Sequence, residues 1–165
     1  MSNPRFSGIR HIILDLGGVL LNLDYDATVK AFEALGIADF KQRFSQLSQS
    51  DFFDKWEKGQ LTKEEFFAGM RGVAEVPITD TQIAGAWNAM LLDFPLRRLQ
   101  ILQQLQLHFD LFLLSNTNEI HLEAFNEILK NTVGIPSLAH FFDKVYYSHQ
   151  VGMRKPDAEI FLKIL

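Results

Sequence analysis

The sequence contains no cysteine, which excludes disulfide bonds and thiolate metal sites. A reducing cytoplasm fits this absence, and we expect a cytoplasmic protein. No apolar run approaches the roughly 20 residues that a helix needs to span a bilayer. The N-terminal stretch MSNPRFSGIRH also lacks the apolar centre of a signal peptide. These absences predict a protein that has no membrane partner.

The sequence has no cluster of basic residues, and its histidines do not have the spacing of metal ligands. The net charge is −4, and the Lys and Arg residues are scattered along the chain. Without a basic stripe we expect no nucleic-acid partner. We interpret each of the five histidines as a surface or packing residue. The 165 residues, 47% hydrophobic and 22% charged, suffice for one globular domain, with or without a small insertion.

The hydrophobic pattern divides the chain into three sections. Residues 9–15 form a short apolar run that ends before Gly17 and Gly18. This is typical of a buried parallel strand rather than an alternating edge strand. Helical patterns fill the next section, and helices and strands alternate from Pro95 onward, which is typical of a parallel α/β sheet. We therefore predict a Rossmann-like core with an all-helical insertion, the core comprising residues 1–22 and 95–165 and the insertion residues 23–94.

The middle section has the pattern of four to five helices, with no convincing strand. Thr62 with Glu65, and Thr79 with Gln82, have the spacing of capping boxes and mark two helix starts. The section is rich in Phe and contains both tryptophans. We interpret these aromatic residues as the core of a small bundle, with a ligand-facing subset as the alternative.

Polar residues follow three successive predicted strands. They are Asp15, the Ser-Asn-Thr of residues 115–117, and the Arg-Lys of residues 154–155. Each alone has an ordinary explanation, as a helix cap, a turn or a solvated cation. In an open parallel sheet, however, ligands bind beyond the carboxyl ends of the strands. The joint placement of these residues therefore predicts a binding site at that edge.

These residue types suit phosphoryl transfer. A carboxylate such as that of Asp15 is a competent nucleophile toward phosphorus and gives an aspartyl-phosphate. Because a phosphate dianion repels a carboxylate, the approach needs positive charge, from Lys155 and from a divalent cation. The groups available to bind the phosphate through N–H or O–H are Gly17, Gly18, Ser115 and Asn116.

Three segments, ILDLGGVLL, FLLSNTN and VGMRKPDAEIF, resemble in order the first three motifs of the haloacid-dehalogenase-like (HAD) hydrolases. The closest resemblance is to bacterial sugar-phosphate phosphatases, such as α-D-glucose-1-phosphate phosphatase. It covers nearly the whole chain, with the helical insertion in the place of the family's helical cap domain. The resemblance implies a Mg²⁺-dependent phosphatase that acts on a small phosphorylated metabolite.

The resemblance also implies a role for each site residue. Asp15 would be the nucleophile and a Mg²⁺ ligand, and Gly17 would offer its backbone carbonyl to the metal. Ser115 and Asn116 would bind the phosphate. Lys155 would balance the charge of the nucleophile and the phosphate. The cap would close over the site, exclude water and select the substrate.

The chain departs from the family pattern at Gly17. Most phosphatases of the family carry there a second Asp, a general acid of the kind that contributes roughly 10²–10⁴ in rate. We consider two hypotheses. Either the substrate has a good leaving group, such as an anomeric sugar 1-phosphate, or a nearby acid such as Asp24 takes over.

A second departure concerns the acidic fourth motif, which completes the Mg²⁺ site of the family. It is expected well beyond Lys155, whereas the sequence ends at Leu165 in an amphipathic helical pattern. We therefore expect a C-terminally shortened chain whose last strand or strands are missing. Such a chain should bind Mg²⁺ weakly, show little phosphatase activity and expose apolar surface that a second copy can cover.

Two alternatives remain open. One is a non-catalytic HAD-fold binding protein, because the second Asp and the fourth motif are absent. The other is a 2-haloacid dehalogenase, which also uses a lone Asp and needs no metal. The glycine pair and the Ser-Asn-Thr turn favour phosphate over a haloacid.

Overall fold

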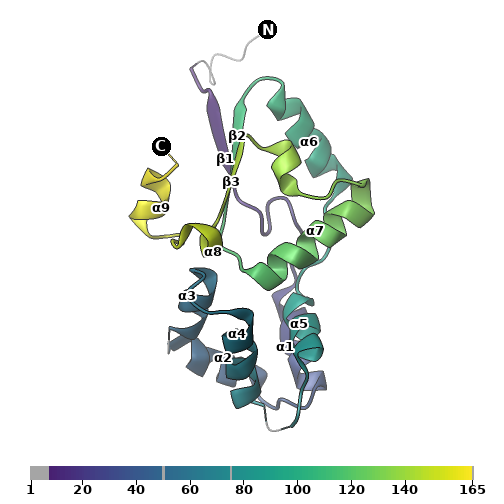
Figure 1. Cartoon of the computed structure of the whole chain (residues 1–165). Helices are drawn as coiled ribbons and strands as arrows, with labels where there is room; N and C mark the ends of the chain where they lie inside the picture. Colours follow the sequence, from purple (N-terminus) through teal and green to yellow (C-terminus); the bar gives the residue numbers. More distant parts are fainter. Residues whose placement is uncertain (1–7, 50, 75, 165) are drawn as a thin grey trace.

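The computed structural model describes residues 8–49, 51–74 and 76–164, so the first seven residues of the predicted core lie outside it. Figure 1 shows a sheet with flanking helices in one half and five helices, α1–α5, in the other. The elements are β1 (His11–Leu14), α1 (Tyr25–Ala34), α2 (Phe40–Gln49), α3 (Phe52–Glu57), α4 (Lys63–Gly72), α5 (Asp80–Asn88), α6 (Leu96–Gln106), β2 (Asp110–Ser115), α7 (Glu119–Val133), the 3-10 helix η2 (Leu138–Phe141), β3 (Lys144–Tyr147), α8 (Ser148–Val151) and α9 (Ala158–Leu162).

The sheet confirms the predicted parallel α/β architecture. Its three strands are all parallel and lie in the order β1-β2-β3. Leu14 at the end of β1 pairs with Leu113, and Ser115 at the end of β2 pairs with Tyr147. The carboxyl ends of the strands therefore lie at one edge, which faces the five helices (Figure 1).

The prediction that the first strand is buried is wrong for the described sheet. Among the described residues β1 pairs only with β2, so it is an edge strand. Its side chains alternate between exposed and half-buried, and Ile13 is 44% exposed. An apolar run reveals that a segment favours a strand, but it does not reveal how many strands flank it.

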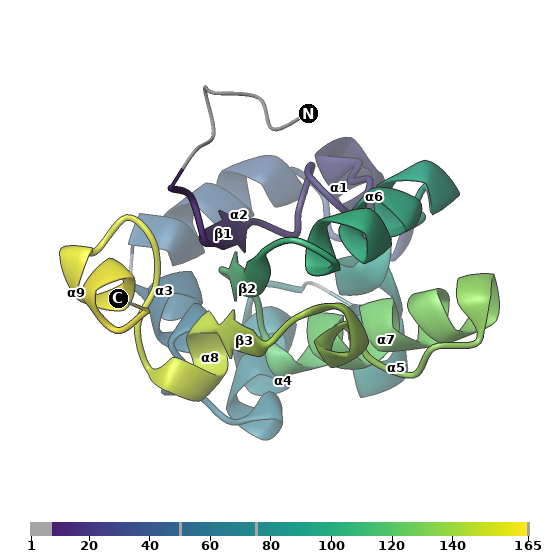
Figure 2. The same cartoon turned by 90° about the horizontal axis from the view of Figure 1, so that it is seen from above.

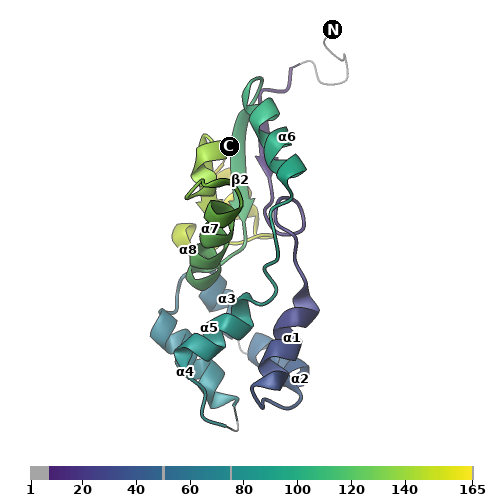
Figure 3. The ribbon, with the colours of Figure 1, turned by 90° about the vertical axis from the view of Figure 1, so that its right-hand side faces the viewer.

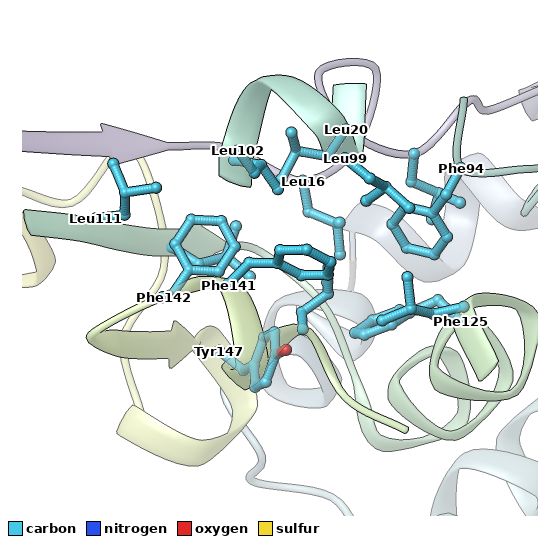
Figure 4. Close-up of a cluster of buried hydrophobic side chains, with 14 residues drawn as sticks. Leu16, Leu20, Phe94, Leu99, Leu102, Leu111, Phe125, Phe141, Phe142 and Tyr147 are labelled. Atoms are coloured by element: carbon cyan, nitrogen blue, oxygen red, sulfur yellow. The ribbon is translucent and has the colours of Figure 1, made fainter. Parts of the chain in front are cut away.

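Helices cover the sheet on both sides. Figure 2 shows α6 and α7 on one side of the strands and α9 on the other. Leu111 and Leu113 of β2 are fully buried toward α6 and α7, whereas Leu114 packs with Ile160 of α9. The larger cluster, drawn in Figure 4, also includes Leu16, Leu20, Phe94, Leu99, Leu102, Phe125, Phe141, Phe142 and Tyr147.

The middle section is helical, as predicted. Between Asp24 and Asp93 the described residues contain five helices and no strand. Thr62 and Thr79 both form the predicted capping boxes, at the starts of α4 and α5. The five helices share an aromatic core and stand apart from the sheet layer in side view (Figure 3). Over the described part of the chain, no helix is long and apolar enough to cross a membrane.

The helical section contacts the sheet half through α5 and α7. The His121 ring stacks on Trp87 at 5.3 Å and 3°, and its Nδ1 lies 2.8 Å from Asn88 Oδ1. The adjacent Ile120 is buried in the aromatic core of the five helices. Burial lowers the pKa of His121 to about 4, so this imidazole is neutral at physiological pH.

We predict that His121 makes folding stability depend on pH. The unfolded chain binds the proton first as pH falls, since the ordinary pKa of 6.5 lies above the folded pKa of about 4. Stability is therefore complete above pH 6.5 and declines as pH falls toward 4, by about 2 kcal/mol at pH 5. Urea unfolding at about pH 7 and pH 5 measures this loss. His121→Gln should remove it, whereas His108→Gln, at an exposed position, should retain it. An unchanged pH slope in His121→Gln contradicts the prediction.

Candidate active site

A pocket of about 430 Å³ lies where the carboxyl ends of the strands meet the helical section. Five of the six predicted site residues line it, namely Asp15, Gly17, Ser115, Asn116 and Lys155. The sixth, Gly18, does not line it. The topology therefore gathers residues from three distant segments of the chain, as expected for the edge of a parallel sheet.

Gly18 shapes the turn that follows Asp15. Its φ of +73° lies in the left-handed region that favours glycine, and its N–H donates to Leu21 O at 2.9 Å. The Leu16 carbonyl accepts from the N–H groups of residues 19–21. The turn is thus closed by its own hydrogen bonds, and the N–H of Gly18 is engaged within it.

Asp15 and Lys155 form an ion pair in the pocket. Lys155 Nζ lies 2.8 Å from Asp15 Oδ1 and also donates to Leu114 O at 3.1 Å. The N–H of Leu16 donates to the same carboxylate oxygen at 2.7 Å. Within the described part of the chain, Asp15 Oδ2 has no hydrogen-bond or ion-pair partner. One carboxylate oxygen is therefore held in place, and the other is available to a ligand.

Asn116 fixes the backbone that carries Lys155. Its Nδ2 donates to Lys155 O, and its Oδ1 accepts from the N–H of Lys155, both at 2.8 Å. Ser115 is 3% exposed at the end of β2, beside this pairing. The Asn116 side chain thus positions the ammonium, a role that the order of motifs along the sequence does not reveal.

The space beside Gly17 is occupied by an apolar side chain. A Cβ atom on Gly17 would lie 2.8 Å from Leu23 Cδ1, and both residues line the pocket. Asp24, the acid that we considered as a replacement, is instead the N-cap of α1. Its Oδ1 accepts from the N–H of Asp26 at 3.0 Å, and Asp24 does not line the pocket. The structure does not support that hypothesis.

Glu57 is an acid in the pocket wall that the sequence analysis missed. It ends α3, and its Oε2 lies 3.2 Å from Arg154 Nε, in an ion pair without hydrogen-bond geometry. Burial raises the pKa of the Glu57 carboxyl, against the opposing charge of Arg154, and the Asp54 carboxylate raises it further. No sequence signal marks Glu57, because its place depends on how α3 docks on the loop that carries Arg154.

Aromatic side chains from the helical section form part of the opposite wall. Phe44 of α2 and Trp87 of α5 line the pocket, although Trp87, like Trp56, is also buried in the core of the five helices. The alternative of a ligand-facing aromatic subset is therefore supported for two of these residues. Together they give the pocket an apolar side that faces its charged side.

The oxygen donors present are of the kind that Mg²⁺ prefers. Asp15 offers a carboxylate oxygen and Gly17 a backbone carbonyl, and carboxylate, carbonyl and water oxygens are the usual ligands of this ion. The described residues contain no group of three or more His, Asp or Glu side chains placed to hold a metal. The predicted ligand pair thus fits the ion chemically but is small.

Known proteins are similar to this chain over nearly its whole length. A D-ribitol-5-phosphate phosphatase from Bacteroides thetaiotaomicron is 33% identical over 153 residues, which cover 93% of this chain and 74% of that protein. A HAD family enzyme from the same species, in complex with magnesium and inorganic phosphate, matches with a TM-score of 0.86 and 35% identity over 95% of this chain and 77% of its own.

A HAD-like family hydrolase from Porphyromonas gingivalis matches with a TM-score of 0.82 and 33% identity, over 94% of this chain and 74% of its own. The family model described as haloacid dehalogenase-like hydrolase matches residues 9–165. The resemblance to the haloacid-dehalogenase-like hydrolases, inferred from three short motifs, is thereby confirmed, whereas the specific likeness to α-D-glucose-1-phosphate phosphatase is not shown. The chain belongs to the haloacid dehalogenase-like hydrolases.

Proposed function

We propose that this protein is a Mg²⁺-dependent phosphatase that hydrolyses a small phosphorylated metabolite through an aspartyl-phosphate on Asp15. The observation that carries the proposal is the ion pair of Asp15 and Lys155, 2.8 Å apart in the wall of a pocket. It holds a carboxylate next to the cation that an incoming phosphate requires. The absence of cysteine is consistent with a cytoplasmic site of action.

The proposed roles follow from the contacts. Oδ2 of Asp15 attacks phosphorus, since Oδ1 is held by Lys155 and by the N–H of Leu16. The Lys155 ammonium lowers the repulsion between carboxylate and phosphate. The Ser115 hydroxyl and the backbone N–H of Asn116 bind phosphate oxygens. Asn116 also keeps the Lys155 backbone in register through its side chain.

Asp15 and the Gly17 carbonyl would hold the Mg²⁺ ion, with water in its other positions. When bound, the ion would supply positive charge that offsets the repulsion of the carboxylate and the phosphate. Because the described residues contain no group of three or more His, Asp or Glu side chains placed to hold a metal, we expect weak Mg²⁺ affinity and reduced turnover in this chain.

The substrate class follows from the helical section and from the relatives. We assign residues 23–94 to a cap and residues 1–22 and 95–165 to the core. The cap then contributes Phe44 and Trp87 to the wall that contacts the organic part of the substrate. The similar phosphatase acts on D-ribitol 5-phosphate, which favours a polyol or sugar phosphate with a primary ester over glucose 1-phosphate.

Asp15→Asn tests the nucleophile. We expect it to lower turnover of D-ribitol 5-phosphate on the order of 10⁴-fold or more, because the amide cannot form the covalent intermediate. Phosphate release in the presence of Mg²⁺ measures the effect. Asp26→Asn, at an exposed position of α1, is the matched control and should keep full activity. If the wild-type chain releases no phosphate from any ester, the phosphatase proposal fails and the non-catalytic and dehalogenase alternatives remain.

Lys155→Met tests the charge balance. The variant keeps an unbranched chain as far as Cε but removes the ammonium 2.8 Å from Asp15. We expect kcat to fall roughly 10²–10³-fold, as when one stabilising donor of a transition state is lost. Lys130→Met, on the exposed side of α7, should leave kcat unchanged. Wild-type kcat in Lys155→Met would exclude the assigned role.

A further inference from the structure

The proposed reaction requires a proton donor that the core does not provide. The alkoxide leaving a primary phosphate ester is a strong base, and a general acid typically contributes roughly 10²–10⁴ in rate. Gly17 has no side chain, and Leu23 fills the space in which one would begin. Asp24 caps α1 and lies off the pocket wall. The donor must therefore be sought elsewhere on the pocket wall.

Four titratable side chains line the pocket besides Asp15. Lys155 is engaged by Asp15 Oδ1 and Leu114 O. His121 is 8% exposed and stacks on Trp87, and its Nδ1 is hydrogen-bonded to Asn88 Oδ1. The other two are Tyr25 and Glu57.

Tyr25 and Glu57 differ in exposure. Tyr25 is 68% exposed, so bulk water can take its place as a donor. Glu57 is half-buried, and its Oε2 is shielded from water against Arg154. Its other oxygen, Oε1, is not among the fully buried unpaired atoms and has no hydrogen-bond partner among the described residues. Glu57 is therefore the wall residue with a sheltered carboxyl group and one oxygen available to a ligand.

We propose that Glu57 is the general acid that protonates the leaving oxygen of the substrate, an assignment that rests on the phosphatase function proposed above. Contacts between α3 and the segment around Lys155 fix the position of Glu57. Arg154 NH1 lies 3.2 Å from Asp54 and its Nε 3.2 Å from Glu57. Lys58 Nζ lies 3.4 Å from Asp157. The carboxyl thus faces the residue that precedes the charge-balancing lysine.

The electrostatic surroundings suit this role. Burial is the largest effect on the pKa of Glu57 and raises it, and Asp54 acts in the same direction against Arg154. A raised pKa keeps more of the carboxyl protonated as pH approaches neutrality, which a proton donor needs. The loop beside α3 carries Arg154, Lys155 and Asp157. The helices packed against α3 carry Lys41 and Arg43 (α2), Lys63, Glu64, Glu65 and Arg71 (α4), Asp80 (α5) and His149 (α8).

The two half-reactions balance with Glu57 as the only added proton carrier. In the first, Asp15 Oδ2 forms a bond to phosphorus and the bond from phosphorus to the ester oxygen breaks. The electron pair stays on that oxygen, which takes the Glu57 proton and leaves as the alcohol. In the second, water attacks phosphorus and gives a proton to the Glu57 carboxylate. Asp15 leaves as the carboxylate, inorganic phosphate is released, and both side chains return to their initial states.

Glu57→Gln, assayed on two esters, tests the assignment. D-ribitol 5-phosphate has an alkoxide leaving group that needs the proton, whereas the phenolate of p-nitrophenyl phosphate leaves without one. We expect kcat/KM to fall about 10²-fold for the alkyl ester and less than about threefold for the aryl ester. Asp54→Asn is the matched control, because it also removes an Arg154 contact of α3 but does not line the pocket. It should change both rates by the same factor.

Equal losses on both esters in Glu57→Gln, or no loss on the alkyl ester, would overturn the assignment. They would leave the proposed function standing, because the aryl ester reports the nucleophile alone. If the wild-type chain hydrolyses neither ester, the proposed function itself fails.

A binding measurement tests the protonated Glu57 carboxyl independently of turnover. The affinity of Asp15→Asn for D-ribitol 5-phosphate is then measured by calorimetry from about pH 5 to pH 8, alone and combined with Glu57→Gln. If Glu57 donates a proton to the ligand, the affinity of Asp15→Asn falls as pH rises through the pKa of Glu57. We expect this fall to be roughly threefold or more larger in Asp15→Asn than in the double variant. Coincident pH profiles would overturn the assignment.

Discussion

The contact between Asp15 and Lys155 is the interaction on which the rest of the site depends. The carboxylate follows β1 and the ammonium follows α8, so they meet only because parallel strands end at a common edge. Asn116, at the end of the intervening strand, binds the Lys155 backbone at two atoms. The segments that follow the three strands thus contribute the proposed nucleophile, the residue that positions Lys155 and the counter-charge.

The helical section is attached to this frame in two physically different ways. On one side, Trp87 stacks on buried His121. On the other, Asp54 of α3 and the adjacent Lys58 contact Arg154 and Asp157 through partly exposed ion pairs, and Lys63 of α4 pairs with Glu119 and Glu123 of α7. Exposed pairs contribute only about 0–1 kcal/mol each, whereas burial of aromatic surface contributes more. The α5 contact therefore provides most of the attachment, and the α3 contact chiefly fixes which polar groups face the pocket.

Features set by neighbouring residues were predictable from the sequence, and those set by docking were not. The capping boxes at Thr62 and Thr79 depend on atoms three residues away, so their spacing sufficed. The placement of Asp15 and Lys155 at one pocket followed from the rule for parallel sheets. The exposure of Ile13, the presence of Leu23 beside Gly17 and the burial of Glu57 depend on segments far along the chain. No local pattern encodes those contacts.

The placement of the acid has a consequence for the proposed chemistry. An acid at position 17 would belong to the same turn as the nucleophile and would be present whatever the helical section does. Glu57 instead reaches the pocket only while α3 lies against Arg154. The proposed proton donor and the apolar wall of Phe44 and Trp87 thus belong to the same helical section, so under the proposed mechanism the leaving oxygen would be protonated where bulk water is reduced. Leu23 extends this apolar surface beside Gly17, because its side chain occupies the space in which a side chain at position 17 would begin.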